Sequence, residues 1–239
     1  MKNSVQAATF RVYQQQRVKH MTPFFGPEVY PLYVRVTHGT KSLNFKSHCF
    51  EQLLKAKYQN GVRLGHAAPS LAEVIQLETR LIGFLIGRHP DDFSLPVFKK
   101  EYDFYTHDLL DELDEDFKNY LVSFFFREGM PSIAYLLENQ RAKLTADLVL
   151  DDLKRSLSKP VYDKMIEASL YAAPPYIPLL AFYRLRRPDS TGMLLTYQFY
   201  QENFESELKE FIRTAYPDYK LNHPYRYLSD YLRKLEVNH

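Results

Sequence analysis

Cationic and hydrogen-bonding side chains alternate with apolar ones in two stretches near the start of the chain. The stretches are ATFRVYQQQ, residues 8–16, and YPLYVRVTHGTKSLNFKS, residues 30–47. Their polar positions are Arg11, Tyr13, Tyr33, Arg35, Thr37, Asn44 and Lys46, and Lys19 and Lys41 lie in the adjoining loop and turn. Arginine and asparagine can bond base edges, lysine can bind phosphate, and tyrosine can pack on sugar or a thymine methyl group. These nine residues are therefore candidates for contact with nucleic acid.

The apolar residues between the candidates predict β-strands that have one oily face. They are Phe10, Val12, Leu32, Val34, Val36, Leu43 and Phe45. Successive side chains of a strand point to opposite faces, so the apolar residues share one face and the polar residues share the other. Gly39 supplies the positive φ that a hairpin turn often needs. The sequence predicts a small three-stranded antiparallel sheet with one polar, cationic face.

A sheet of this size with one apolar face is not stable alone, so another element must cover that face. The segment CFEQLLKAKYQ, residues 49–59, follows the sheet and contains no helix breaker. Phe50, Leu53, Leu54 and Tyr58 recur in it at helical spacing. We expect a helix here, packed on the sheet.

From about Ser70 onward the hydrophobic spacing becomes that of helices. Ser70 and Glu73 form the pattern of a capping box, and several helices follow, separated by proline and glycine. Residues 60–70, NGVRLGHAAPS, have the composition of a linker. We therefore predict an α+β chain with a basic sheet-plus-helix domain over residues 1–62 and a larger all-helical domain over residues 68–239.

The net charge of +2 conceals an uneven distribution of charge along the chain. Residues 1–65 hold ten Lys and Arg against two Asp and Glu, which gives +8, and the remaining residues give −6. A basic module joined to an acidic remainder is the electrostatic pattern expected of a protein that meets a polyanion at one end. Chance clustering of ordinary solvated charges is the alternative.

The sequence shows no clear pattern for a disulfide, a metal site, a cofactor site or a membrane span. Cys49 is the only cysteine, so no intrachain disulfide can form and a cytoplasmic location is expected. The acidic run DELDED, residues 111–116, lacks the spacing and the glycine of a calcium loop, and the histidines show no metal spacing. No phosphate loop, dinucleotide fingerprint or nucleophile elbow is present, and no apolar run is long enough to span a membrane. We expect no cofactor, no metal, no membrane association and no catalytic residues.

The strand, the loop, YPLYVRVTHGTKSLNFKS and the following helix together resemble a known DNA-binding module. It is the arm-type domain at the N-terminus of many bacterial tyrosine recombinases, and the likeness covers roughly residues 8–60. The resemblance implies that the sheet enters the major groove of double-stranded DNA. It also implies that Arg35, Asn44 and Lys46 lie on the reading face, with Arg11 and Tyr13 beside them.

The catalytic signature of those recombinases is not expected here. The one His-x-x-Arg sequence is His223–Arg226, and only thirteen residues follow Arg226, too few for the helices that should place a nucleophilic tyrosine. Tyr227 and Tyr231 are close by, but Tyr231 shares an amphipathic pattern with leucines. The expectation is a non-catalytic DNA-binding protein associated with a mobile element or with regulation.

Two alternatives remain open at the level of sequence. In the first, the polar face has no binding role, because it is an ordinary solvated surface or because the helical part covers it. In the second, the chain is a protein-interaction or oligomeric scaffold that uses its helical domain and the free face or edge of the sheet. An enzyme without a recognisable motif is a third class, for which no nucleophile, base and orienting group can be assembled from neighbouring segments.

Overall fold

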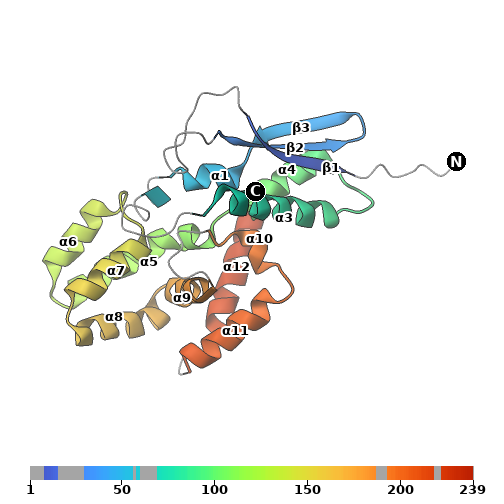
Figure 1. Ribbon diagram of the computed structural model, residues 1–239. Coiled ribbons are helices and arrows are strands. Elements are labelled where there is room, and N and C mark those ends of the chain that lie inside the picture. Colours follow the sequence, from blue (N-terminus) through green and yellow to red (C-terminus); the bar gives the residue numbers. More distant parts are fainter. Residues whose placement is uncertain are drawn as a thin grey trace. The chain divides into compact units, whose positions relative to one another are not determined.

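The computed structural model describes residues 8–15, 30–55, 58–59, 69–186, 193–217 and 222–238 (Figure 1). A three-stranded sheet comes first and a series of helices follows, which confirms the predicted α+β class. The contacts divide the chain into a first unit, residues 1–106, and a second unit, residues 107–238. None of the helices within the described residues combines the length and the apolar character needed to cross a bilayer.

The sheet consists of β1 (Thr9–Gln14), β2 (Leu32–His38) and β3 (Lys41–Lys46). The strands are antiparallel and lie in the order β1-β2-β3, so β2 is central. Gly39 has a φ of 61° in the turn between β2 and β3. Only a residue without a Cβ adopts this conformation readily, which is why the hairpin turns here.

The strand register sorts the side chains into the two predicted faces. Arg11, Arg35 and Asn44 are cross-strand neighbours in one row, and Tyr13, Tyr33 and Lys46 form the next row on the same face. The row between these two holds Val12, Val34 and Phe45, and the row on the other side of the arginines holds Phe10, Val36 and Leu43, all apolar. Because neighbouring rows point to opposite sides of a sheet, the polar and apolar residues are separated as the alternation predicted.

The apolar face packs against α3 (Leu71–Gly87) and α4 (Leu95–Tyr105). Leu32, Val34 and Val36 of the central strand are completely buried. The Phe45 ring meets the Tyr102 ring of α4 edge-on, with the ring centroids 4.7 Å apart. Figure 1 shows these helices on one side of the sheet.

Two further expectations about the first unit are modified by the structure. The helix that follows the sheet, α1 (His48–Leu53), is shorter than the expected helix over residues 49–59, and it packs against α3. The apolar face of the sheet, which this helix was expected to cover, is covered by α3 and α4. These two helices group with the sheet, so the boundary between the units falls after Thr106 instead of at residues 62–68. The capping box at Ser70 and Glu73 is confirmed, since each residue's side chain bonds the other's backbone N–H.

The described part of the second unit is built from helices. They are α5 (Leu109–Arg127), α6 (Pro131–Gln140), α7 (Ala146–Ser156), α8 (Lys159–Ala172), α9 (Tyr176–Arg186), α10 (Thr196–Phe199), α11 (Phe204–Ala215) and α12 (Asn222–Asn238). Its core is aromatic: the rings of Phe117 and Tyr176 stack with their centroids 4.8 Å apart. Aromatic rings of this size bury large apolar areas in the core.

A buried carboxyl group joins the end of the sheet to the helices beneath it. The hydroxyl groups of Ser47 and Tyr102 each donate to a different oxygen of Glu78, both over 2.5 Å. The same hydroxyls accept backbone N–H groups from the first turn of α1, Phe50 to Ser47 and His48 to Tyr102. Burial raises the pKa of Glu78, although the two hydroxyl bonds favour its ionised form.

This raised pKa makes the stability of the chain depend on pH. As the pH rises above about 4, we expect the free energy of unfolding of the wild type to fall relative to that of a Glu78→Gln variant. The reason is that the folded state keeps a proton that an unfolded glutamate releases near pH 4.3. The proton's contribution is complete below the unfolded pKa and is lost as the pH rises through the folded pKa, by up to about 1.4 kcal/mol per pH unit. Urea titrations of both proteins from about pH 4 to about pH 8 measure the difference. A difference that stays constant over this range contradicts the assignment.

Candidate functional site

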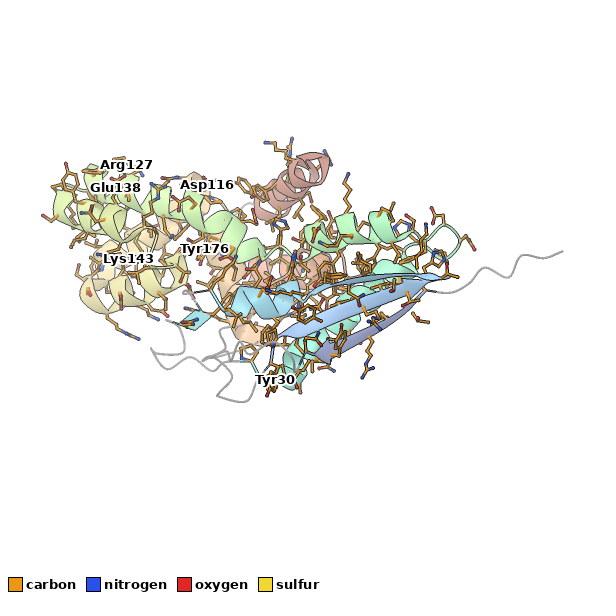
Figure 2. All side chains as sticks on the ribbon, turned by 90° about the horizontal axis from the view of Figure 1, so that it is seen from above. Tyr30, Asp116, Arg127, Glu138, Lys143 and Tyr176 are labelled. Carbon is orange, nitrogen blue, oxygen red and sulfur yellow. The ribbon has the colours of Figure 1, made fainter. Side chains whose placement is uncertain are left out.

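The candidate site is the face of the sheet opposite α3 and α4, called here the polar face. Its residues are Thr9, Arg11, Tyr13, Tyr33, Arg35, Thr37, Ser42, Asn44 and Lys46. Arg11, Arg35, Asn44 and Lys46 are exposed, and the two tyrosines and Thr37 are half-buried. Figure 2 draws the side chains on the sheet and labels Tyr30, which precedes β2. The structure thus brings seven of the nine predicted residues onto one surface.

The middle row of the polar face carries two arginines on neighbouring strands. Arg11 of β1 lies directly across from Arg35 of β2, and Arg35 lies across from Asn44 of β3. Like charges directly opposite each other destabilise a strand pair. None of the ion pairs found among the described residues joins a carboxylate to either arginine. A bound anion would relieve this repulsion.

The second row adds an aromatic surface and a lysine. The rings of Tyr13 and Tyr33 lie 6.2 Å apart, and the Arg11 guanidinium stands 5.8 Å from the centre of the Tyr13 ring. A cation over an aromatic face at this distance is held electrostatically while it stays exposed to solvent. Lys46 forms an ion pair with Glu51 of α1, with Nζ and Oε1 3.2 Å apart. Glu51 therefore offsets part of the positive charge at this end of the face.

Two of the predicted residues lie elsewhere, and two unpredicted ones join the site. Lys41 pairs with His38 at the exposed tip of the hairpin, in a row that points to the side of Leu43 and Phe45. Lys19 lies outside the described residues. Thr9 and Ser42 belong to the polar face, and their positions two residues before Arg11 and Asn44 would have identified them from the alternation alone.

Asp114, in the acidic run of α5, takes part in the packing of the second unit. Asp114 accepts the backbone N–H of Ala146 over 2.6 Å at the start of α7, and it pairs with Lys118 at 2.6 Å. Burial raises the pKa of this half-buried carboxyl. Over the residues that the structure describes, His, Cys, Asp and Glu nowhere gather in threes in a way that would hold a metal ion.

Tyr231, near the end of the chain, takes part in a contact between α12 and α5. The Tyr231 hydroxyl donates to Glu112 over 2.8 Å. Burial and the Glu112 carboxylate both raise the pKa of Tyr231, which disfavours the phenolate. The Arg226 side chain is exposed, and its Nε lies 3.8 Å from Oδ2 of Asp230. These contacts stabilise α12 and its attachment to α5.

The pairing of Lys46 with Glu51 gives a test of where anions bind. Changing Glu51→Gln releases Lys46 and adds one positive charge beside the polar face, so we expect the variant to elute from a heparin column at a higher salt concentration than the wild type. Glu128→Gln is the matched control, because Glu128 pairs with Lys164 at 2.6 Å in the second unit and the substitution changes the charge equally. Equal shifts for both variants would show that anion binding responds to net charge and not to the polar face.

No protein-family model, curated protein or solved structure matches the chain. The resemblance to the arm-type domain accordingly rests on the stretch at residues 30–47, where the register now shows how its side chains are arranged. What the polar face does is inferred below from its geometry and charge.

Proposed function

We propose that the chain binds double-stranded DNA by placing the polar face of its sheet in the major groove, without catalysing a reaction. The observation that carries the proposal is the row of Arg11, Arg35 and Asn44 on the side of the sheet that α3 and α4 leave uncovered. A cross-strand pair of arginines costs the free protein stability, and phosphate or a base edge would turn that cost into binding energy.

The dimensions of the sheet suit the groove. Strands about 4.8 Å apart make a three-stranded sheet about 10 Å wide between its outer strands, and the major groove of B-DNA is about 12 Å wide. The central strand would then face the base edges, and the two outer strands would lie beside the phosphate backbones. The half-buried rings of Tyr13 and Tyr33 are suited to pack on sugars or thymine methyl groups.

The charge distribution supports the same partner. The first unit holds fourteen Lys and Arg against eight Asp and Glu, and the second unit, with its last residue, holds seventeen against twenty-one. Lys and Arg that neutralise phosphates release counterions, which drives binding at low salt. A cytoplasmic location and a role in a mobile element or in regulation are the finer parts of this proposal.

A salt titration tests the proposal directly. If about five to eight phosphates are neutralised, the logarithm of the affinity for a duplex should fall with the logarithm of the salt concentration with a slope of about −5 to −7. We expect the double variant Arg35→Glu and Lys46→Glu to lose at least about tenfold in affinity, because two cations of the polar face become anions.

The control reverses one lysine and one arginine of the second unit, Lys154→Glu and Arg155→Glu, both exposed on α7. This variant has the same net charge as the first and should keep most of the affinity. An electrophoretic mobility shift at two salt concentrations measures all three proteins. Absence of wild-type binding at low salt, or equal losses in both variants, contradicts the proposal.

Protein association is a second candidate function, favoured by exposed apolar side chains in the second unit. Tyr135 and Leu136 of α6 are 59% and 64% exposed, and the Tyr135 ring meets the ring of Phe126 edge-on at 5.3 Å. Exposed aromatic and leucine side chains that lie together are typical of interfaces. On this view the chain acts as an oligomer or a scaffold, through these helices or through the edge strands β1 and β3.

Sedimentation velocity at increasing protein concentration tests self-association through this surface. If it occurs, Leu136→Glu should shift the chain toward monomer, because it places a charge among apolar neighbours. Leu185→Glu is the control, since Leu185 of α9 is 70% exposed. A wild-type chain that remains monomeric at every concentration, or an equal effect of both variants, argues against this surface.

A further inference from the structure

We infer that Arg35 is the residue of the polar face that recognises guanine, and that Asn44 positions Arg35 instead of reading a base itself. The inference rests on the proposed function, because it concerns how the same face would select a DNA sequence. It starts from one contact, the hydrogen bond that Arg35 Nε donates to Asn44 Oδ1 over 2.7 Å.

The chemistry of this bond determines the orientation of the asparagine. A guanidinium has only donors, so the amide must turn its oxygen and not its nitrogen toward Arg35. The two residues are direct cross-strand neighbours, which keeps their Cβ atoms about 5 Å apart and makes the contact a property of the strand register. Asn44 thus restrains a long side chain that would otherwise sample many rotamers on an exposed surface.

The bond leaves the recognition end of Arg35 available. Because Nε donates to Asn44, the N–H groups of Nη1 and Nη2 remain as a second set of donors in the plane of the guanidinium. Two parallel donors match the two acceptors, O6 and N7, that guanine presents in the major groove. No other base pair offers this pair of acceptors side by side, so a held guanidinium discriminates among bases.

Asn44 is poorly suited to the role that its residue type suggests. Bidentate recognition of adenine needs the amide oxygen to accept from N6 and the amide nitrogen to donate to N7. In Asn44 the oxygen already accepts a charged donor, and its orientation is set by Arg35. The sequence pattern suggested two independent readers, whereas the structure joins them into one unit with a single reading group.

The location of each arginine separates their roles. Arg35 is in β2, the central strand, and would lie over the middle of the groove floor. Arg11 is in the outer strand β1, beside the Tyr13 ring, where it would meet the phosphate backbone. Arg35 is therefore expected to determine sequence preference and Arg11 to contribute mainly to salt-dependent affinity.

Selection from a random duplex library tests the inference. The wild type should enrich guanine at one position, and its affinity for that site should exceed the affinity for a site with adenine there by about tenfold. Arg35→Ala should bring this ratio close to one. Asn44→Ala should lower the ratio to about threefold or less, and because it changes no charge it should leave the salt slope near that of the wild type.

Two further variants separate base reading from phosphate binding. Arg11→Ala should keep the guanine ratio and reduce the magnitude of the salt slope by about one. Arg80→Ala is the control for a lost arginine, because Arg80 is exposed on α3, which packs on the opposite face, and it should leave both quantities unchanged. Thermal unfolding of each variant checks that the sheet is intact.

The outcomes distinguish this inference from the proposed function. Three outcomes overturn the inference and leave DNA binding standing. They are binding to duplex without a guanine preference, a guanine preference that survives Arg35→Ala, and a ratio of guanine-site to adenine-site affinity in Asn44→Ala that equals that of the wild type. Enrichment of adenine that is lost in Asn44→Ala overturns it as well. Failure of the wild type to bind any duplex at low salt overturns both.

Discussion

The strand register of the small sheet is the constraint on which the rest of the first unit depends. With β1, β2 and β3 paired as they are, the two central apolar rows alternate with the polar rows. A shift of one residue in any strand would move its apolar side chains into solvent and its charges toward α3 and α4. The buried residues Leu32, Val34 and Val36 therefore hold the register, and the register in turn places Arg11, Arg35 and Asn44 side by side.

The end of β3 is secured by a second interaction of a different kind. Glu78 lies among Ser47, Cys49 and Tyr102, where it accepts two hydroxyl groups that also cap backbone groups of α1. Because a buried carboxyl requires these partners, the junction between β3 and α1 has few alternative arrangements. This keeps Lys46, just before the junction, next to Glu51 and on the polar face.

The polar face itself shows a balance between stability and charge. Its two arginines are cross-strand neighbours, and the Glu51 carboxylate at this end of the sheet pairs with Lys46. Apolar or oppositely charged residues in the row of Arg11 and Arg35 would stabilise the fold more than two arginines do. The presence of this row on an uncovered surface is a physical reason to look for an anionic partner, and the bond between Arg35 and Asn44 suggests how the partner would be read.

The alternation of residue types was enough to predict the strands of the sheet and its two faces, because it depends only on neighbours along the chain. The turn at Gly39, the capping box at Ser70 and the placement of seven of the nine candidate residues on one face were predicted in this way. Only the tertiary structure decided that α3 and α4 cover the sheet, because helices with similar apolar stripes compete for one surface and their packing depends on contacts distant in sequence. The buried position of Glu78 and the pairing of Arg35 with Asn44 were decided in the same way. Sequence spacing shows which side a residue faces, but cross-strand register and burial determine what it touches.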